Sequence, residues 1–347
     1  MKSYLVKLKP MEPYFFGNEK TFRFSGEKNQ GQMRNSYYIK SERTPLQTTL
    51  LGAMRYLFLL TKSYRLDDAD RARVGDRSFD IDAEDQTFGK IACISPLFLL
   101  KGSEKLVVAP FDCDNRKNEK TQKFICSSYV PFGLYAGIDT SKGRKLYTPE
   151  YVAKNGIRDC FMNVDSGALT PAKDIFIYED RVGNKKQLQD KTEDKSFFKK
   201  QYCNLKKDYA FGFYLTLDDT MAPPDGTSSL FLGQGKSLFS VTFREEADDI
   251  DAKLSRRLGE NAVYLRSDTF VDSDIYAHSA FAVTQLRDYR AYKTAAGGRV
   301  EKGDKLHKLI KAGSVFIVND KDAFEKMISR KNCQIIGFNR IVKSDKA

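Results

Sequence analysis

The sequence of 347 residues has no tryptophan, two histidines and six cysteines. The histidines, His278 and His307, form neither an HxxxH nor an HxH pattern, so a histidine-based metal site would need distant carboxylates to complete it. The cysteines lie far apart without a CxxC pair, which matches neither a zinc site nor a dense disulfide framework. We therefore expect reduced, mostly structural thiols, no metal and no cofactor. The cysteines are Cys93, Cys113, Cys126, Cys160, Cys203 and Cys333.

Long apolar runs are also missing. No stretch approaches the ~20 apolar residues of a membrane span, and the first residues, MKSYLVKLKPMEPYFF, lack the apolar centre of a signal peptide. We expect a cytoplasmic protein without membrane contact.

The charge is strongly positive. Lysine and arginine number 58 against 46 acidic residues, which gives a formal net charge of +12. Such a chain is attracted to polyanions through counterion release, so a nucleic acid is the leading partner. A basic protein whose charge only keeps it in solution is the alternative that charge alone leaves open.

The order of the predicted elements indicates an α+β fold. Strands at 4–8, 173–178, 209–217 and 238–243, with a helix at 46–61, follow the order of a ferredoxin-like fold whose second helix is reduced or replaced. With 41% apolar residues and a length beyond the ~100–200 residues of one domain, we expect two such RRM-like domains.

We place the first domain at 1–245, with insertions at 62–172 and 181–208. Within the first insertion only a short strand at 105–109 is evident. The second, smaller and degenerate domain is placed at 246–347. It contains predicted strands Ala262–Ser267, Gly313–Val318 and Gln334–Val342 and a helix Asp322–Arg330.

The segment Asn18–Arg43 mixes cations with aromatic side chains. Arg34, Tyr37, Lys40 and Arg43 belong to this mixture. Cations beside aromatic rings suit phosphate contact combined with base stacking, although a solvated loop with a few anchoring aromatics is also possible.

The helix at 46–61 begins with polar residues. Thr44 is the expected N-cap and Pro45 the expected first helical residue. Gln47, Thr48 and Thr49 then lie at a helix N-terminus, where free N–H groups favour an anion such as phosphate.

A lysine-rich insertion separates two predicted strands. Between Lys185 and Lys207 there are eight lysines and three acidic residues. Lys199 and Lys200 follow the aromatic pair Phe197 and Phe198 directly. We expect a basic hairpin that protrudes from a sheet edge, with a flexible solvated loop as the alternative.

The segment LGQGKS forms a Gly-rich loop. Its glycines would let backbone amides approach a phosphate, and its lysine supplies charge. A Walker A motif would need glycine at the position of Leu230 and a helix afterwards, whereas strand-like residues follow. The loop predicts phosphate contact without ATPase chemistry. Its residues are Gly233, Gln234, Gly235, Lys236 and Ser237.

Five stretches together resemble a known family: KPMEPYFFG, TPLQTTLLGAMR, LTPAKDIFIYED, LGQGKS and AGSVF. Their order and spacing, from residue 2 to about residue 340, resemble the RAMP proteins of CRISPR effectors, and among them subunit 3 of the Cmr (type III-B) complex. The resemblance implies a non-catalytic subunit of a hetero-oligomer that binds the 5′ handle of the crRNA. It also implies contact with the large polymerase-like subunit and the backbone RAMP subunit, and only indirect contact with target RNA.

Carried onto this chain, the resemblance implies that the handle lies against the start of the first helix and the Gly-rich loop. The helix residues are Gln47, Thr48, Thr49 and Arg55, and the loop residues run from Gly233 to Ser237. The insertion 181–208 would be the thumb that wedges beside the junction of handle and guide, with Phe197 and Phe198 as wedges. The segment 18–43 could be the thumb instead.

Two other function classes stay open. A repeat-cleaving RAMP endoribonuclease would need a general acid and base around the scissile phosphate, for which only two histidines are present, although Tyr and Lys can substitute. A structural subunit could use its basic surface to bind an acidic protein partner.

Overall fold

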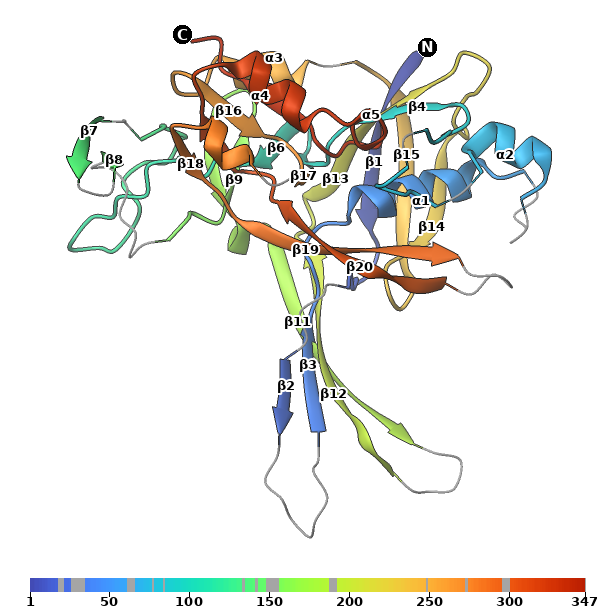
Figure 1. Ribbon diagram of the computed structural model, residues 1–347. Coiled ribbons are helices and arrows are strands. Elements are labelled where there is room, and N and C mark those ends of the chain that lie inside the picture. The colour runs from blue at the N-terminus through green and yellow to red at the C-terminus, as the bar shows by residue number, and fades with distance from the viewer. Residues whose placement is uncertain are drawn as a thin grey trace.

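The computed structural model describes residues 1–17, 22–25, 35–60, 66–76, 78–83, 85–132, 135–140, 143–147, 156–186, 192–247, 249–271, 274–294 and 300–346. These residues form a strand-rich mixed fold with few helices, which confirms the coarse part of the predicted α+β class (Figure 1). No helix in the described part is long and apolar enough to cross a membrane. The number of ferredoxin-like units and the domain boundary stay predictions.

The largest sheet is built around β1 (Lys2–Pro10). Tyr4, Val6 and Leu8 alternate into the core, as the pattern YLVKL predicts, and β1 pairs antiparallel with a strand on each side. The sheet order is β10-β9-β6-β5-β13-β1-β15-β14, with β4 also paired to β13. The strands are β4 (Ile91–Ile94), β5 (Phe98–Lys101), β6 (Glu104–Val108), β9 (Cys160–Asn163), β10 (Leu169–Pro171), β13 (Tyr209–Leu217), β14 (Thr227–Leu232) and β15 (Ser237–Glu245).

Helix α1 (Gln47–Phe58) contributes Leu50, Met54 and Phe58 to the core cluster that also contains Val6 and Leu8. The predicted cap at Thr44 and helical start at Pro45 are wrong, since the N-cap is Leu46 and no side chain caps the helix. A second helix, α2 (Asp68–Val74), lies in the charged stretch of the first insertion, where Asp67 accepts a hydrogen bond from the Asp70 amide as N-cap.

The start of α1 is fixed by a buried side chain. The Gln47 amide is 6% exposed and donates to the carbonyls of Ser95 and Ile336 at 2.9 and 3.0 Å. Gly337 makes room for it, because a Cβ at this position would lie 1.9 Å from Gln47 Nε2. The first turn of α1 is therefore held by the loop between the last helix and the last strand.

A four-stranded sheet projects away from the body (Figure 1). Its order is β11 (Phe176–Lys186), β12 (Thr192–Leu205), β3 (Asn35–Lys40) and β2 (Phe22–Ser25). Antiparallel pairing of β11 with β12 confirms that the lysine-rich insertion is a hairpin. The predicted strand at 173–178 begins late, because Ala172–Asp174 forms a 3-10 turn, η2. Strand β3 pairs parallel with β12, so the two segments predicted as alternative thumbs form one sheet.

The C-terminal part forms a second small sheet, with order β18-β21-β16-β22, and a separate hairpin, β19–β20, extended by β17. The predicted strand Gln334–Val342 is wrong over most of its length. Gln334 and Ile335 are the last residues of helix α5, and the observed strand, β22, begins only at Ile341. The elements are α3 (Ile250–Ser255), β16 (Ala262–Leu265), β17 (Thr269–Phe270), η3 (Ile275–His278), β18 (Phe281–Val283), β19 (Leu286–Thr294), β20 (Val300–Ile310), β21 (Val315–Ile317), α4 (Lys321–Ile328), α5 (Lys331–Ile335) and β22 (Ile341–Lys343). A further pair, β7 (Tyr135–Thr140) and β8 (Gly143–Tyr147), lies in the first insertion.

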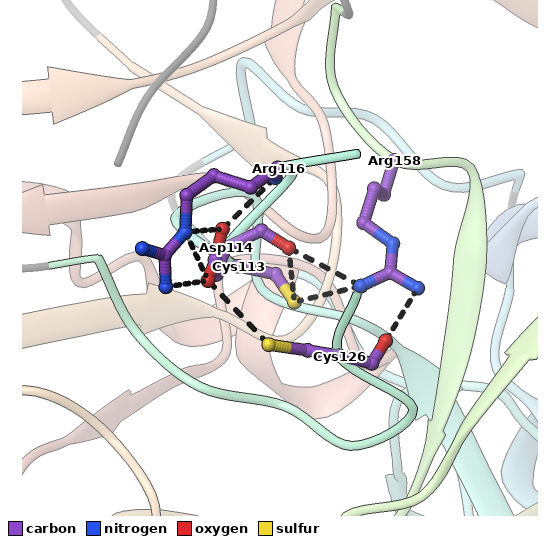
Figure 2. Close-up of polar contacts among 5 residues, drawn as sticks. All are labelled: Cys113, Asp114, Arg116, Cys126 and Arg158. Atoms are coloured by element: carbon purple, nitrogen blue, oxygen red, sulfur yellow. Dashed lines mark hydrogen bonds and ion pairs between the residues drawn. The ribbon is translucent and has the colours of Figure 1, made fainter. Parts of the chain in front are cut away.

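Polar contacts of Arg158 and Asp114 tie together the segment between β6 and β9 (Figure 2). Arg158 donates to the carbonyls of Asp114 and Cys126 at 3.2 and 3.0 Å. The Asp114 carboxylate accepts from Arg116 at 2.7 Å and from the Cys126 thiol at 3.4 Å. One guanidinium and one carboxylate thus hold two stretches of loop together.

Gly337→Ala should destabilise the fold by at least about 3 kcal/mol, because the added methyl meets Gln47 and backbone carbonyls at a φ of +90°. Gly226→Ala is the matched control, since it has a φ of +71° and no atom within 4 Å of the added carbon. It should cost only the left-handed backbone strain of about 1–2 kcal/mol. Urea unfolding measures both free energies, and equal losses would contradict the packing at Gly337.

Two neighbouring aspartates should respond to pH with opposite sign. Burial raises the pKa of Asp112 to about 6, although Tyr129 donates a hydrogen bond to it at 2.9 Å. Burial alone would raise the pKa of Asp114 too, but hydrogen bonds from Arg116 and Cys126 hold it below its usual value.

The raised Asp112 pKa means that the folded state binds the proton more tightly, so its contribution to stability grows as pH falls from above 6 toward 4. Asp112→Asn should remove this dependence and stabilise the protein by up to about 3 kcal/mol at pH 8. Asp114→Asn should destabilise it at neutral pH, with a smaller loss in acid. Thermal unfolding across pH checks both variants, and a destabilised Asp112→Asn protein at pH 8 would refute the assignment.

Candidate nucleic-acid interface

The base of the projecting sheet is fastened to the body by backbone hydrogen bonds. The Tyr14 and Cys203 amides donate to each other's carbonyls at 2.8 and 2.9 Å, and the Ser41 amide donates to the Gln201 carbonyl at 2.9 Å. The segments that follow β1 and β3 therefore position the proximal half of β12.

One face of the sheet carries a group of aromatic and cationic side chains, which we call the basic aromatic cluster. Phe198, Lys200 and Tyr202 alternate along β12 and share this face. The Lys200 ammonium lies 5.3 Å from the Phe198 ring centre and 5.4 Å from that of Phe15. The cluster consists of Phe15, Arg181, Phe198, Lys200 and Tyr202.

Phe15 and Arg181 complete the cluster from other segments. The Phe15 ring packs edge-on against Tyr202 at 5.5 Å, and the Arg181 guanidinium lies 4.4 Å from the centre of the Tyr202 ring. Phe15 is 1% exposed and forms the floor. Cation–π contact at these distances holds both cations against the rings.

The two cations of the cluster differ in their partners. Arg181 forms an ion pair with Glu179 at 2.7 Å, and this hydrogen bond raises the pKa of Arg181. No carboxylate lies within ion-pair distance of Lys200 in the described part of the chain. Lys200 is therefore the cluster cation whose charge is open to an external anion.

Gly183 sets the position of the Phe198 ring. It stands opposite Phe198 in the β11–β12 register, and a Cβ there would lie 2.2 Å from the ring. A glycine at this place lets the ring lie against the backbone of β11.

The opposite face of the same sheet also carries two cations beside an aromatic ring. Lys199 forms an ion pair with Asp180 at 2.8 Å and lies 5.4 Å from the Tyr38 ring centre. Lys40 lies 5.5 Å from the same ring. Asp180 also accepts from Gln201 at 3.1 Å, so on this face the charge of Lys199 already has a fixed carboxylate partner.

Arg43 follows β3 and braces the sheet base. It donates to the Tyr178 hydroxyl at 2.5 Å and to Asp159 at 2.6 Å, and lies 5.8 Å from the Phe176 ring centre. Its guanidinium thus joins the hairpin to the loop before β9.

The Gly-rich loop is the turn between β14 and β15, so it precedes a strand, as its sequence predicts. Gly233 has a φ of +77°, and a Cβ there would lie 2.5 Å from the Phe15 carbonyl, which accepts from the Gln234 amide at 2.9 Å. Ser237 is buried and donates to the Pro13 carbonyl at 3.1 Å.

The turn adjoins the basic aromatic cluster. The Cβ position of Gly235 lies 3.9 Å from the Tyr202 hydroxyl, and Gln234 is bonded to the backbone of Phe15. Lys236 is exposed and adopts a φ of +54°. The structure therefore brings together Phe198, Lys200 and the Gly-rich turn.

The predicted residues on α1 have their contacts inside the fold. The side-chain amide of Gln47 donates to two backbone carbonyls, and the Thr48 side chain forms a hydrogen bond with the Tyr289 hydroxyl. Thr49 is half-buried, and its amide donates to the Leu46 carbonyl at 2.9 Å. Arg55 lies 5.6 Å from the Phe88 ring centre, and burial lowers its pKa to about 10.

For three predicted site residues the structure describes either nothing or only the backbone. Arg34 is outside the described residues. Tyr37 pairs with Phe198 through its backbone and Phe197 with Asn184, but the side chains of Tyr37 and Phe197 are outside the description.

Sequence reasoning did not assign Phe15, Arg181 or Tyr202 to the site. Tyr202 had a usable signal, because it shares the spacing of two with Phe198 and Lys200 along a strand. Phe15 and Arg181 had no such signal. Phe15 reaches the site through its contact with Tyr202, which is distant in the chain, and Arg181 through its register opposite Lys200.

Comparisons with known proteins relate this chain to a protein family and to solved structures. A family model described as CRISPR-associated protein (Cas_Cmr3) matches residues 6–272. A search of curated proteins gives no match.

Two solved structures have a similar fold. A chain of the cryo-EM structure of the type III-B Cmr-beta bound to cognate target RNA has a TM-score of 0.55 and 14% identity, covering 98% of this chain and 96% of that chain. A chain of the same assembly bound to cognate target RNA and AMPPnP has a TM-score of 0.52 and 13% identity, covering 97% and 95%. At these identities the likeness shows a shared fold.

Proposed function

The chain belongs to the CRISPR-associated Cmr3 family, and we propose that it is a non-catalytic RNA-binding subunit of a type III-B effector complex. It binds the 5′ handle of the crRNA in the cytoplasm and touches target RNA only indirectly. It links the large polymerase-like subunit to the backbone RAMP subunit. The observation that supports this proposal best is Lys200, which lies between two aromatic rings, lacks a carboxylate partner among the described residues and adjoins the Gly-rich turn.

The chemistry of the cluster suits a single strand of RNA. Lys200 and Lys236 supply positive charge for phosphates, and the rings of Phe198 and Tyr202 supply surfaces on which bases stack. Stacking contributes about 1–3 kcal/mol per base, and charge-assisted hydrogen bonds to phosphate add to it. A handle of constant sequence can then be selected through hydrogen bonds to base edges.

The projecting sheet as a whole is the thumb of this proposal. Segments 18–43 and 181–208 both contribute strands to it, so neither acts alone. Phe198, supported by Gly183, is the described aromatic that is placed to wedge beside an RNA base.

Repeat cleavage is the enzymatic alternative. Of the two histidines, His307 lies on β20, with its ring centre 5.9 Å from that of Phe270 and 6.2 Å from that of Tyr289. Its ring packs on these aromatic core residues, and burial together with the nearby charge of Lys305 lowers the pKa of His307, although Asp82 opposes this effect. These contacts favour packing over general acid–base catalysis at the cluster.

Lys200→Ser should weaken binding of a labelled handle RNA by about 1–2 kcal/mol and lower the salt dependence by about one phosphate contact, because it removes an unpaired charge. Lys199→Ser is the matched control: it removes the same charge from the adjacent residue, where Asp180 already compensates it. Fluorescence anisotropy at several salt concentrations measures both. Equal losses for the two variants would contradict the assignment to this face.

Handle recognition itself is tested by competition. Guide RNA with its handle should displace the labelled RNA at lower concentration than guide RNA without it, since only the former offers the constant bases. Equal affinities would contradict handle recognition and leave a basic subunit without this selectivity.

The purified protein should leave repeat RNA intact during incubation without metal. Gel analysis of the RNA after prolonged incubation measures this outcome. Specific cleavage within the repeat would overturn the non-catalytic proposal, and its loss in a His307→Ala protein would assign it to that histidine.

A further inference from the structure

The central sheet has a face that α1 does not cover. On β1, Tyr4, Val6 and Leu8 lie in the main core, while on the other face Leu5 is buried, Lys7 is exposed and Lys9 is half-exposed. The next strands repeat this alternation, with Leu230 and Leu232 buried and Phe231 between them 64% exposed. From Lys7 to the end of β1 that lies beside the Gly-rich turn, the three strands β1, β14 and β15 therefore present a solvent-facing surface, which we call the open face.

The open face carries hydroxyl groups and positive charge. Register pairs Lys7 with Thr242 and Lys9 with Ser240, and these in turn stand opposite Thr227 and Ser229 of the edge strand. None of the outward positions of these strands, all of them described, carries a carboxylate.

Lys7 and Lys9 have no ion-pair partner among the described residues, whereas Arg244, also on this face, forms an ion pair with Glu246. On its other side Lys7 stands opposite Gly212, where the side chains of Phe98 and Leu100 occupy the place of a Cβ. The two lysines are thus the cations of this face that an external anion meets without competition from a described carboxylate.

Each end of the open face offers an apolar surface. At one end Phe231 stands opposite Leu238, directly beside the Gly-rich turn. At the other end is a hollow of ≈ 280 Å³ whose lining includes Leu5 and Leu100 together with the polar side chains of Lys7, Ser103, Thr242 and Arg244. Its size is near the lower limit of pockets that hold small organic molecules, about 300 Å³.

We propose that the open face binds a single strand of RNA, with phosphates at Lys7 and Lys9, one base stacked on Phe231 and another inserted in the hollow. This site lies on the body of the protein and does not depend on handle binding by the projecting sheet.

The chemistry selects RNA among the possible occupants. An acidic peptide could pair with the two lysines, but it would have no specific use for the four hydroxyl side chains or for the exposed ring of Phe231 beside them. The ribose 2′-hydroxyl is both donor and acceptor, so serine and threonine hydroxyls can pair with it, while the exposed ring stacks on any base. Positive charge spaced along one strand follows the repeat of a phosphate backbone.

The test uses a labelled twelve-nucleotide uridine RNA, which contains no handle, and the full-length protein. Lys7→Ser with Lys9→Ser should weaken binding by about ten-fold or more and reduce the salt dependence by about 1.4 in logarithmic slope, the value for two phosphates on a single strand. Phe231→Ser should weaken binding about 5- to 150-fold through lost stacking of one base. Lys326→Ser with Lys331→Ser is the matched control, since it removes two exposed lysines from the C-terminal helices.

Binding by the open-face variants equal to that of the control variant would overturn the proposal, provided that thermal unfolding shows all proteins folded. Lys200→Ser, measured with handle RNA in parallel, separates the two sites. If only Lys200→Ser loses RNA binding, the thumb is supported as an RNA site and the open face is not. If only the open-face variants lose RNA binding, the open face is supported and the thumb is not.

Discussion

The parallel pairing of β3 with β12 is the contact on which the projecting sheet depends. A two-stranded hairpin is marginally stable in water, and β11–β12 extends far beyond the body. Strand β3, with β2 beside it, widens this hairpin to four strands. The pairing is continued at the base by the hydrogen bonds of Tyr14 with Cys203 and of Ser41 with Gln201. Because the two partners come from residues 35–40 and 192–205, neither segment can form this sheet without the other.

This pairing also places the charges that the proposed function uses. The base of β12 lies against the segment after β1, so Phe15 becomes the floor beneath Lys200 and Tyr202. The same segment accepts the backbone of the Gly-rich turn, which brings Gly235 beside Tyr202. One short stretch, residues 12–16, therefore connects the sheet, the aromatic rings and the turn. A net charge of +12 attracts a polyanion, but only such local geometry can orient it.

Local patterns in the sequence predicted the elements whose burial alternates. Strand β13 matches its predicted bounds, Tyr209–Leu217, and the lysine-rich hairpin and the strand after the Gly-rich turn were also predicted. The start of α1 was not, because it depends on a contact between Gln47 and Ile336, far apart in the chain. The short apolar run near Gln334 is compatible with a strand and with a helix. Tertiary packing selects the helix, α5. The cluster itself depends on register and on a parallel pairing, which no local pattern contains.

The proposed function requires that the basic aromatic cluster and the adjoining turn contact RNA. Photocrosslinking with 4-thiouridine placed at successive handle positions, followed by mass spectrometry of the peptides, tests it directly. We expect adducts on peptides containing residues 198–202 and 233–236. Adducts confined to other peptides, with none on β12 or the turn, would contradict it.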